Sequence, residues 1–360
     1  MGSGGLGSPT LRQLTAGGAE IFARGFSSVD WERLRGKRLF VTGGTGFVGC
    51  WLLEGLLWGN RQFQLDMAID LLTRTPSRFR DKAPHLAEDP AICLIRGDVS
   101  DLTAVRGAYD RVIHAAADVG SPSTNPLDMY EAIVNGTRQA VELASRSSAS
   151  RFLYLSSGAV YGPQPATIPY IPESYTGAPP LDRPASAYAQ AKRASEWMVS
   201  TLCSQRSITW ISARIFALTG PYIPLDGHFA MSNFLSDIVR QRPIKVKGGT
   251  GVRSYLYGAD LALWLIALLT RDQARGTYNV GSQSAVTILD MARQLSMLAY
   301  GEPRLDVEEC GAESLAGSQR YVPDVARATT TLGLQQYTDL DNALKHSIAW
   351  ARLQSDRLSH

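Results

Sequence analysis

The sequence of 360 residues has few of the features that mark secreted, metal-binding or nucleic-acid-binding proteins. Its cysteines are scattered, without a C-x-x-C pair, at Cys50, Cys93, Cys203 and Cys310. We therefore expect free thiols in a reducing, cytoplasmic compartment, and no metal site. The net charge is only +3, and basic and acidic residues are interspersed without a basic run. Nothing in this pattern favours a nucleic-acid partner.

Long apolar runs are also missing. The richest, residues 261–269, is too short to span a membrane. The N-terminus lacks the basic-then-apolar order of a signal peptide. Residues 1–9 are instead rich in glycine and serine, which is typical of disorder. We expect no membrane association, and an N-terminal extension over residues 1–35 that is partly disordered.

What the chain does have is an alternation of strand and helix signals. The expected strands are 38–42, 68–73, 91–96, 111–114, 152–156 and 209–214. The expected helices are 48–57, 103–109, 126–145, 187–203, 229–240, 261–269, 281–299 and 340–352. Strands that alternate with helices predict an α/β fold, a Rossmann-type doubly wound parallel sheet with a smaller C-terminal α/β region.

The most informative segment, residues 41–49, reads Val-Thr-Gly-Gly-Thr-Gly-Phe-Val-Gly between an expected strand and an expected helix. Gly43, Gly46 and Gly49 have G-x-x-G-x-x-G spacing. Glycines there allow a tight turn, close approach of a pyrophosphate to the backbone, and close helix–strand packing. The helix N-terminus adds N–H groups and the positive end of a dipole. The segment therefore predicts a dinucleotide site.

A second signal is the pair Tyr188 and Lys192, one helical turn apart on a shared face. A nearby ammonium favours the phenolate, which would make Tyr188 an acid/base near neutral pH. A surface tyrosine and a surface lysine would give the same spacing. The helix, however, follows the strand that ends at Ser157, and open α/β sheets place their sites at such strand ends. We therefore assign a catalytic role to Ser157, Tyr188 and Lys192.

Several further segments carry recognisable motifs. They are Gly97-Asp98-Val99, His114-Ala115-Ala116-Ala117, Val134-Asn135-Gly136-Thr137, Ser156-Ser157-Gly158-Ala159-Val160-Tyr161-Gly162, Arg214-Ile215-Phe216 with Gly220-Pro221, and Gly249-Thr250-Gly251-Val252-Arg253-Ser254-Tyr255. In combination with the glycine turn and the Tyr188/Lys192 pair, they resemble the extended short-chain dehydrogenase/reductases. The resemblance is to the NAD-dependent epimerase/dehydratase group acting on nucleotide sugars, and it runs from about Leu34 to Trp350.

The resemblance implies roles for individual residues. The implied cofactor-binding residues are Gly43, Thr45, Gly46, Phe47, Val48, Gly49, Arg74, Asp98, Val99, Ala115, Ala116, Ala117, Asn135, Tyr188 and Lys192. The implied substrate-binding residues are Ser157, Phe216, Arg253 and Arg320. In this family the residue matching Asp98 meets the adenine, and the residue matching Arg253 binds the diphosphate of the sugar nucleotide.

Departures from the family pattern reduce the number of reactions that the chain is expected to catalyse. Typical 4,6-dehydratases carry Thr-Asp-Glu where this chain has Ser157, Gly158 and Ala159, and sugar-acid decarboxylases usually carry a Glu there. Both activities are therefore disfavoured. UDP-galactose 4-epimerases have an Asn at Ala217 and an arginine near Ser314 that this chain lacks; Arg320 is a candidate replacement.

The strand before Arg74 ends in Leu-Leu-Thr, without the acidic residue that binds the ribose 2′-OH of NAD. Arg74 could instead bind a 2′-phosphate, and this slightly favours NADP as the cofactor. If Arg74 is only an exposed arginine near the adenine, the cofactor can equally be NAD.

We expect a nucleotide-sugar epimerase that acts at C4 through a transient 4-keto sugar. One alternative is an NADPH-dependent 4-keto-sugar reductase with the same residues. A lesser alternative is a sensor that binds NADP(H) without chemistry, although such proteins usually lose the Tyr or the Lys.

We expect the NAD(P)-binding domain over residues 36–214. The substrate region should cover mainly 215–360, with segments near 255–282 returning to the cofactor domain. The helices over 126–145 and 187–203 carry apolar residues beyond those needed to cover the sheet. Since the resembling family pairs these helices across a two-fold axis, we expect a homodimer.

Overall fold

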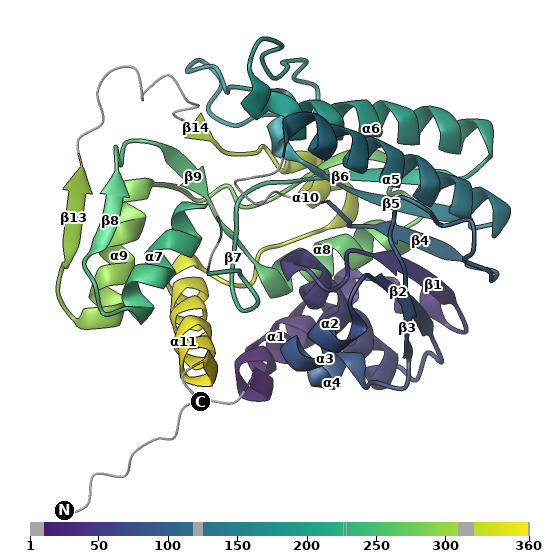
Figure 1. Ribbon diagram of the computed structural model, residues 1–360, viewed down its shortest axis with the longest axis horizontal. Helices are drawn as coiled ribbons and strands as arrows, with labels where there is room; N and C mark the ends of the chain where they lie inside the picture. The colour runs from purple at the N-terminus through teal and green to yellow at the C-terminus, as the bar shows by residue number, and fades with distance from the viewer. Residues whose placement is uncertain (1–10, 118–124, 226, 228, 309–319, 359–360) are drawn as a thin grey trace, which may run out of the picture.

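A seven-stranded parallel sheet organises the computed structural model, which describes residues 11–358 apart from 118–124, 226, 228 and 309–319 (Figure 1). The strand order is β11-β6-β5-β4-β1-β2-β3. The strands are β1 (Arg38–Thr42), β2 (Ala68–Thr73), β3 (Ile92–Arg96), β4 (Arg111–His114), β5 (Arg151–Ser157), β6 (Thr209–Ile215) and β11 (Gly276–Val280). The chain reverses its direction across the sheet between β1 and β4, which is where α/β sheets of this kind bind ligands.

Helices cover both faces of this sheet, which is why central strands such as β1 are buried at every residue but the first. On one face lie α2 (Phe47–Gln62) and α8 (Gly258–Thr270), and on the other lie α5 (Pro126–Arg146) and α6 (Ala187–Gln205). Figure 1 shows α5 and α6 side by side over their face of the sheet. Helix α8 is buried along its whole length because α1 and α2 pack against it and its other side contacts β5 and β6.

The N-terminal segment forms α1 (Leu11–Gly25), followed by the short 3₁₀ turns η1 (Phe26–Ser28) and η2 (Trp31–Leu34). Helix α1 contacts α2, α8 and α11 (Leu340–Leu358). The contact is close: a Cβ on Gly18 would lie 2.8 Å from the Trp51 ring. Part of the expected extension is therefore a packed helix.

The C-terminal region contains three small sheets and the remaining helices. The sheets are β10 (Leu256–Tyr257) with β7 (Leu218–Thr219), β12 (Ala285–Thr287) with β9 (Val252–Ser254) and β14 (Arg320–Tyr321), and β13 (Leu305–Glu308) with β8 (Ile244–Lys247). The helices here are α7 (Ala230–Val239), α9 (Ile288–Tyr300), α10 (Ala326–Leu332) and α11. Helices α3 (Pro76–Lys82) and α4 (Pro84–Ala87) follow β2, and the 3₁₀ turns η3 (Gly158–Tyr161) and η4 (Pro184–Ser186) precede α6.

The expected fold class is confirmed, and the six expected strands are present within one residue at either end. The helix expected at 103–109 is wrong: these residues form turns between β3 and β4. Asp101 accepts hydrogen bonds from the Thr103 amide and hydroxyl, and Gly107 has φ +146°. Both features favour a turn over a helix.

The helix expected from residue 281 begins only at Ile288, because 285–287 form β12 and the Thr287 side chain caps the helix. Among the described residues, Cys50, Cys93 and Cys203 are free thiols, as expected; Cys310 lies outside them. Within the same described ranges, no helix has the length and apolarity needed to cross a membrane.

Candidate active site

The glycine turn connects the end of β1 to the start of α2, and the three glycines with G-x-x-G-x-x-G spacing have different surroundings. A Cβ on Gly43, which has φ +71°, would lie 2.4 Å from the Ala116 nitrogen. A Cβ on Gly49 would lie 2.3 Å from Gly44 Cα. Gly46 is exposed, and only the Gly43 carbonyl, 3.3 Å away, would meet a Cβ there. Gly46 is thus the glycine that presents open backbone at a helix N-terminus.

The end of β4 lies directly against this turn. Ala115, Ala116 and Ala117 follow β4 and are partly exposed. Beneath them, His114 is hydrogen-bonded through Nδ1 to the Thr42 hydroxyl, at 2.7 Å, and through Nε2 to the Thr137 hydroxyl, at 3.2 Å. Burial lowers the pKa of His114 to about 3, so this imidazole is neutral. His114 therefore links the end of β4 to the end of β1, and both its ring nitrogens are used in hydrogen bonds within the protein.

The strand ends of β2 and β3 bring Arg74 and Asp98 near each other. The pKa of the Asp98 carboxyl is lowered, first by the hydrogen bond from the Ser100 amide at 2.9 Å and also by the charge of Arg74. Val99 packs against α5, where a Cβ on Gly136 would lie 2.9 Å from its side chain. Asn135, beside Gly136, is exposed. These residues flank the same edge of the sheet as the glycine turn.

Ser157 ends β5, and helix α6 places Tyr188 and Lys192 beside it. The Lys192 ammonium is buried and donates to the Leu155 carbonyl at 2.7 Å. It lies 5.9 Å from the centroid of the Tyr188 ring and 4.8 Å from that of Tyr154. Burial lowers the pKa of Lys192 to about 7, so near neutrality this amine can both carry and release a proton.

The pKa of Tyr188 differs from the expectation. Burial raises it, and a hydrogen bond with the Ser157 hydroxyl acts in the opposite direction. Desolvation therefore outweighs the hydrogen bond with Ser157, and Tyr188 is a protonated phenol at neutral pH. The contact between Tyr188 and Ser157 joins the two hydroxyl groups that the sequence places far apart.

Tyr321 is a site residue that the sequence analysis missed. Strand β14 lies parallel to β9 and pairs Tyr321 with Arg253, whose guanidinium lies 6.0 Å from the centroid of the Tyr321 ring. The pKa of Tyr321 is raised, mainly by burial, while its hydrogen bond with Ser157 lowers it. A Cβ on Gly158 would lie 2.6 Å from the Tyr321 hydroxyl oxygen. Ser157 therefore has two phenols beside it, Tyr188 and Tyr321.

Of the other expected substrate residues, Phe216 and Arg253 lie beside Tyr321, whereas Arg320 lies apart from them. Phe216 is buried and stacks on Tyr321, with ring centroids 4.5 Å apart. Arg253 is half-buried on the same side of its sheet as Tyr321. Arg320 is paired with Val252, and side chains alternate along strands, so it extends from the opposite side. Its Nε donates to the Pro169 carbonyl at 2.5 Å.

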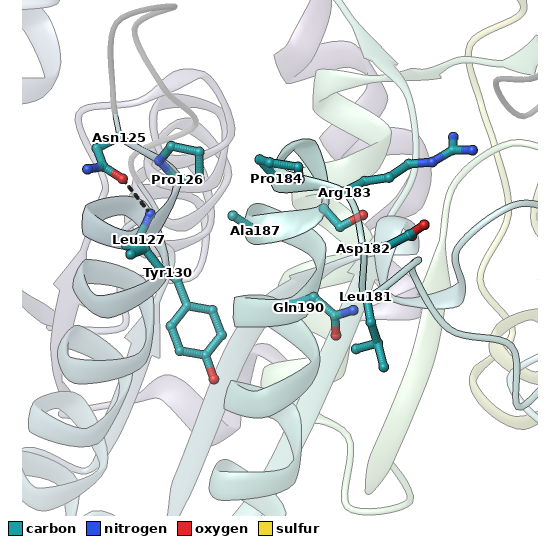
Figure 2. A pocket seen from close by; sticks show the side chains of 11 residues that line it. Asn125, Pro126, Leu127, Tyr130, Leu181, Asp182, Arg183, Pro184, Ala187 and Gln190 are labelled. Atoms are coloured by element: carbon teal, nitrogen blue, oxygen red, sulfur yellow. Dashed lines mark hydrogen bonds between the residues drawn. The ribbon is translucent and has the colours of Figure 1, made fainter.

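A surface pocket of about 460 Å³ opens between the N-terminal turns of α5 and α6 (Figure 2). Figure 2 shows Tyr130 on the α5 side of the pocket, opposite Ala187 and Gln190 of α6. The lining residues are Asn125, Pro126, Leu127, Tyr130, Leu181, Asp182, Arg183, Pro184, Ser186, Ala187 and Gln190. Ser157, Tyr188 and Lys192 do not line it, so this pocket is separate from the catalytic group.

Comparison with known proteins agrees with this geometry. Residues 39–281 match the model of the NAD dependent epimerase/dehydratase family. The chain is 30% identical over 312 residues to UDP-glucuronic acid decarboxylase 6 of Arabidopsis thaliana, covering 85% of this chain and 86% of the relative. It is 26% identical to UDP-glucuronic acid decarboxylase 1 of Xenopus tropicalis, covering 88% of this chain and 72% of that protein.

Among solved structures, the fold matches the epimerase Mth375 of Methanothermobacter thermautotrophicus with a TM-score of 0.78 at 21% identity, covering 94% and 98% of the two chains. It also matches the UDP-glucuronic acid 4-epimerase of Bacillus cereus, in complex with UDP-glucuronic acid and NAD. That TM-score is 0.76 at 19% identity, with 88% and 99% of the chains covered.

Proposed function

The chain belongs to the NAD dependent epimerase/dehydratase family, and from this premise we propose that it epimerises a nucleotide sugar at C4 through a transient 4-keto sugar. The observation that carries this proposal is the meeting of Ser157, Tyr188 and Lys192 at the carboxyl end of β5, with no carboxylate at the two positions that follow Ser157. Gly158 and Ala159 follow Ser157, and the Tyr321 hydroxyl lies where a side chain at position 158 would extend.

The glycine turn and its neighbours fit a dinucleotide. Gly46 offers open backbone at the N-terminus of α2, where the cofactor phosphates would lie. Asp98, Val99 and Asn135 would border the adenosine half, and Ala115–117 would border the nicotinamide half. When bound, the dinucleotide supplies the hydride acceptor and donor. Arg74, exposed at the end of β2, supports NADP as the preferred cofactor.

The protein groups move the proton. As the C4–H bond gives up its hydride, the C4 hydroxyl loses its proton to the phenolate of Tyr188, directly or through Ser157, and a C4 ketone forms. Burial alone disfavours that phenolate. The nearby Lys192 ammonium is the charge that would reduce this penalty while the proton is transferred. Tyr188 would give the proton back to the C4 oxygen when C4 is reduced on its opposite face, which completes the inversion.

Arg253 would hold the diphosphate of the substrate by charge-assisted hydrogen bonds. Tyr321, on the same side of β14 and β9, would then lie between that anchor and Ser157. Holding the diphosphate rather than the hexose leaves the 4-keto ring free to turn and present its other face. The separation of Arg320 from Arg253 argues against a shared diphosphate clamp.

Decarboxylation of a nucleotide-activated uronic acid is a second candidate, favoured by the 30% identity to UDP-glucuronic acid decarboxylase 6. The decarboxylation begins with the same oxidation at C4 as the epimerisation, and the resulting 4-keto uronic acid then loses CO₂. The absence of a Glu in Ser157–Ala159 argues against a decarboxylase.

A 4-ketoreductase would use the same residues but exchange its cofactor at each turnover; Arg74 is the feature that supports a reductase. A sensor without chemistry would not need Tyr188 and Lys192.

The test incubates the full-length protein with UDP-glucose, UDP-N-acetylglucosamine or UDP-glucuronic acid in deuterated water, without added cofactor. An epimerase interconverts C4 epimers with no net NAD(P)H change and no deuterium at C4. Release of CO₂ with a pentose product would establish the decarboxylase. A requirement for stoichiometric NADPH and a 4-keto sugar would establish the reductase. Tyr188→Phe, the matched control, should still bind cofactor, and its turnover should fall by roughly a hundredfold or more.

A further inference from the structure

Helix α3 ends in a lysine whose side chain reaches the glycine turn. The Lys82 ammonium donates a hydrogen bond of 2.8 Å to the Thr45 carbonyl, between Gly43 and Gly46 in the turn. Lys82 is half-buried and lies 37 residues from its acceptor. The turn is thus tied to a helix outside the β1–α2 unit in which the glycine motif lies.

This bond fixes one particular peptide unit. Thr45 and Gly46 share a peptide plane, and its N–H, on Gly46, donates to the Gly43 carbonyl at 3.1 Å. Its carbonyl, on Thr45, receives the Lys82 ammonium and also lies 3.7 Å from the Cys50 sulfur. Both ends of the plane therefore have partners, so the plane cannot rotate. It directly precedes the amides of α2 that face a bound phosphate.

Lys82 is itself positioned by a buried polar group of three residues. Its ammonium lies 6.0 Å from the centroid of the Tyr222 ring. The Tyr222 hydroxyl donates to Glu54 Oε1 at 2.5 Å, and His85 Nε2 lies 2.8 Å from the same oxygen. Glu54 and Tyr222 are buried. Lys82 therefore lies beside a group made of Glu54 from α2, His85 from α4 and Tyr222 from the C-terminal region.

We propose that Lys82 is a positioning residue for the cofactor diphosphate. It pre-forms the glycine turn by holding the Thr45–Gly46 peptide, and its charge would lie near the phosphates of a bound dinucleotide. The inference rests on the proposed function only in requiring a dinucleotide. A turn that is ordered before binding has less conformational entropy to lose on binding, and therefore binds more tightly.

Calorimetry on the full-length protein tests this with NADP⁺, ADP and adenosine as probes. Lys82→Met keeps most of the apolar stem and removes the donor and the charge. We expect it to weaken NADP⁺ and ADP by roughly tenfold or more and to leave adenosine, which has no phosphate, unchanged. Lys82→Arg, which can still reach the carbonyl, should restore most of the affinity. Lys345→Met, an exposed lysine paired with Asp341 on α11, should bind all three probes like the wild type.

Amide hydrogen exchange gives a readout that does not depend on affinity. In the nucleotide-free wild type, the Gly46 amide should be protected, and Lys82→Met should lose that protection while the core strands keep theirs. Unchanged ADP affinity in Lys82→Met overturns the proposal. An equal loss of adenosine and ADP, or a Gly46 amide that exchanges freely in the wild type, also overturns it. None of these outcomes depends on which reaction the enzyme catalyses, and Tyr188→Phe should bind ADP normally.

Discussion

Lys192 carries an ammonium into a site that is almost sealed from water. Only 2% of the residue is exposed, and its one hydrogen bond among the described residues is to a neutral carbonyl, that of Leu155. Burial disfavours the charged form, so the pKa falls from 10.5 to about 7, although the charge of Glu196 acts in the opposite direction. The residue that the sequence marks as catalytic is therefore also a source of instability.

The pH dependence of stability should reveal this. Between about pH 7 and 10.5 the unfolded chain binds a proton at Lys192 that the folded chain has released, so folding stability rises with pH. Below pH 7 the penalty is fully present. Lys192→Met removes it, and the variant's gain in unfolding free energy should be largest near pH 6.5 and shrink towards pH 10. Urea unfolding at both values measures it, and parallel pH profiles of the two proteins would contradict the assignment.

Arg74 should act on the 2′-phosphate alone. We expect Arg74→Ala to weaken NADP(H) by about 1–3 kcal/mol and to leave NAD(H) nearly unchanged. Arg293→Ala, an exposed arginine paired with Asp290 on α9, is the control. Fluorescence titration with both reduced cofactors compares them. If the wild type binds the two equally and Arg74→Ala changes neither, Arg74 does not bind a 2′-phosphate.

Tyr321 should matter for turnover but not for cofactor binding. Tyr321→Phe keeps the stacking on Phe216 and removes the hydroxyl beside Ser157. Losing one hydrogen bond at the reacting centre should lower kcat about tenfold. Steady-state kinetics with a parallel measurement of cofactor affinity would show whether the hydroxyl acts on substrate. A wild-type kcat would reduce Tyr321 to a packing role.

At the scale of elements, local constraints decided what the sequence could predict. The β1–α2 turn was predictable because close contacts require two of its glycines. Gly49 packs against the turn itself, and Gly43 packs against the residues that follow β4. Tyr321 was not predictable, since a two-residue strand carries no periodicity and its partner Arg253 is 68 residues away. Phe216 matched a motif, yet its burial beneath Gly158 depends on packing that no local pattern records.

The glycine turn offers a matched pair of substitutions. Gly49→Ala forces a methyl group to within 2.3 Å of Gly44 Cα, and we expect it to lower the unfolding free energy by about 1–3 kcal/mol. Gly46→Ala meets only one atom, at 3.3 Å, and should leave stability nearly unchanged while weakening the cofactor. Thermal unfolding and calorimetry separate the two effects. Equal destabilisation by both would show that Gly46 is structural.

At the scale of the whole molecule, α5 and α6 present exposed apolar side chains although their inner faces are already buried against the sheet. Leu127 is 70% exposed on α5, and Trp197 is 71% exposed on α6. Neighbouring helices with such an outer surface suit an isologous contact with a second copy. A homodimer therefore remains our proposal for the assembly.

Light scattering coupled to size exclusion should give the mass of a dimer at micromolar concentration. Trp197→Glu should shift the measured mass to that of a monomer, 39.1 kDa. In a two-fold contact both copies would contribute the new carboxylate, so two charges would be buried in the interface. Phe229→Glu changes another exposed aromatic residue, 60% exposed and outside α5 and α6, and should stay dimeric. A monomeric wild type would count decisively against the proposal.

The return of β11 and α8 to the main sheet has a consequence for synthesis on the ribosome. Strand β6 ends at Ile215, but its outer edge is paired by β11, and α8 covers β5 and β6. Translation at about 5–20 residues per second leaves roughly 3–13 s before residue 280 is made. During that interval the nascent chain shows an open strand edge and a bare apolar face, so newly made protein should depend on chaperone capture far more than the finished enzyme does.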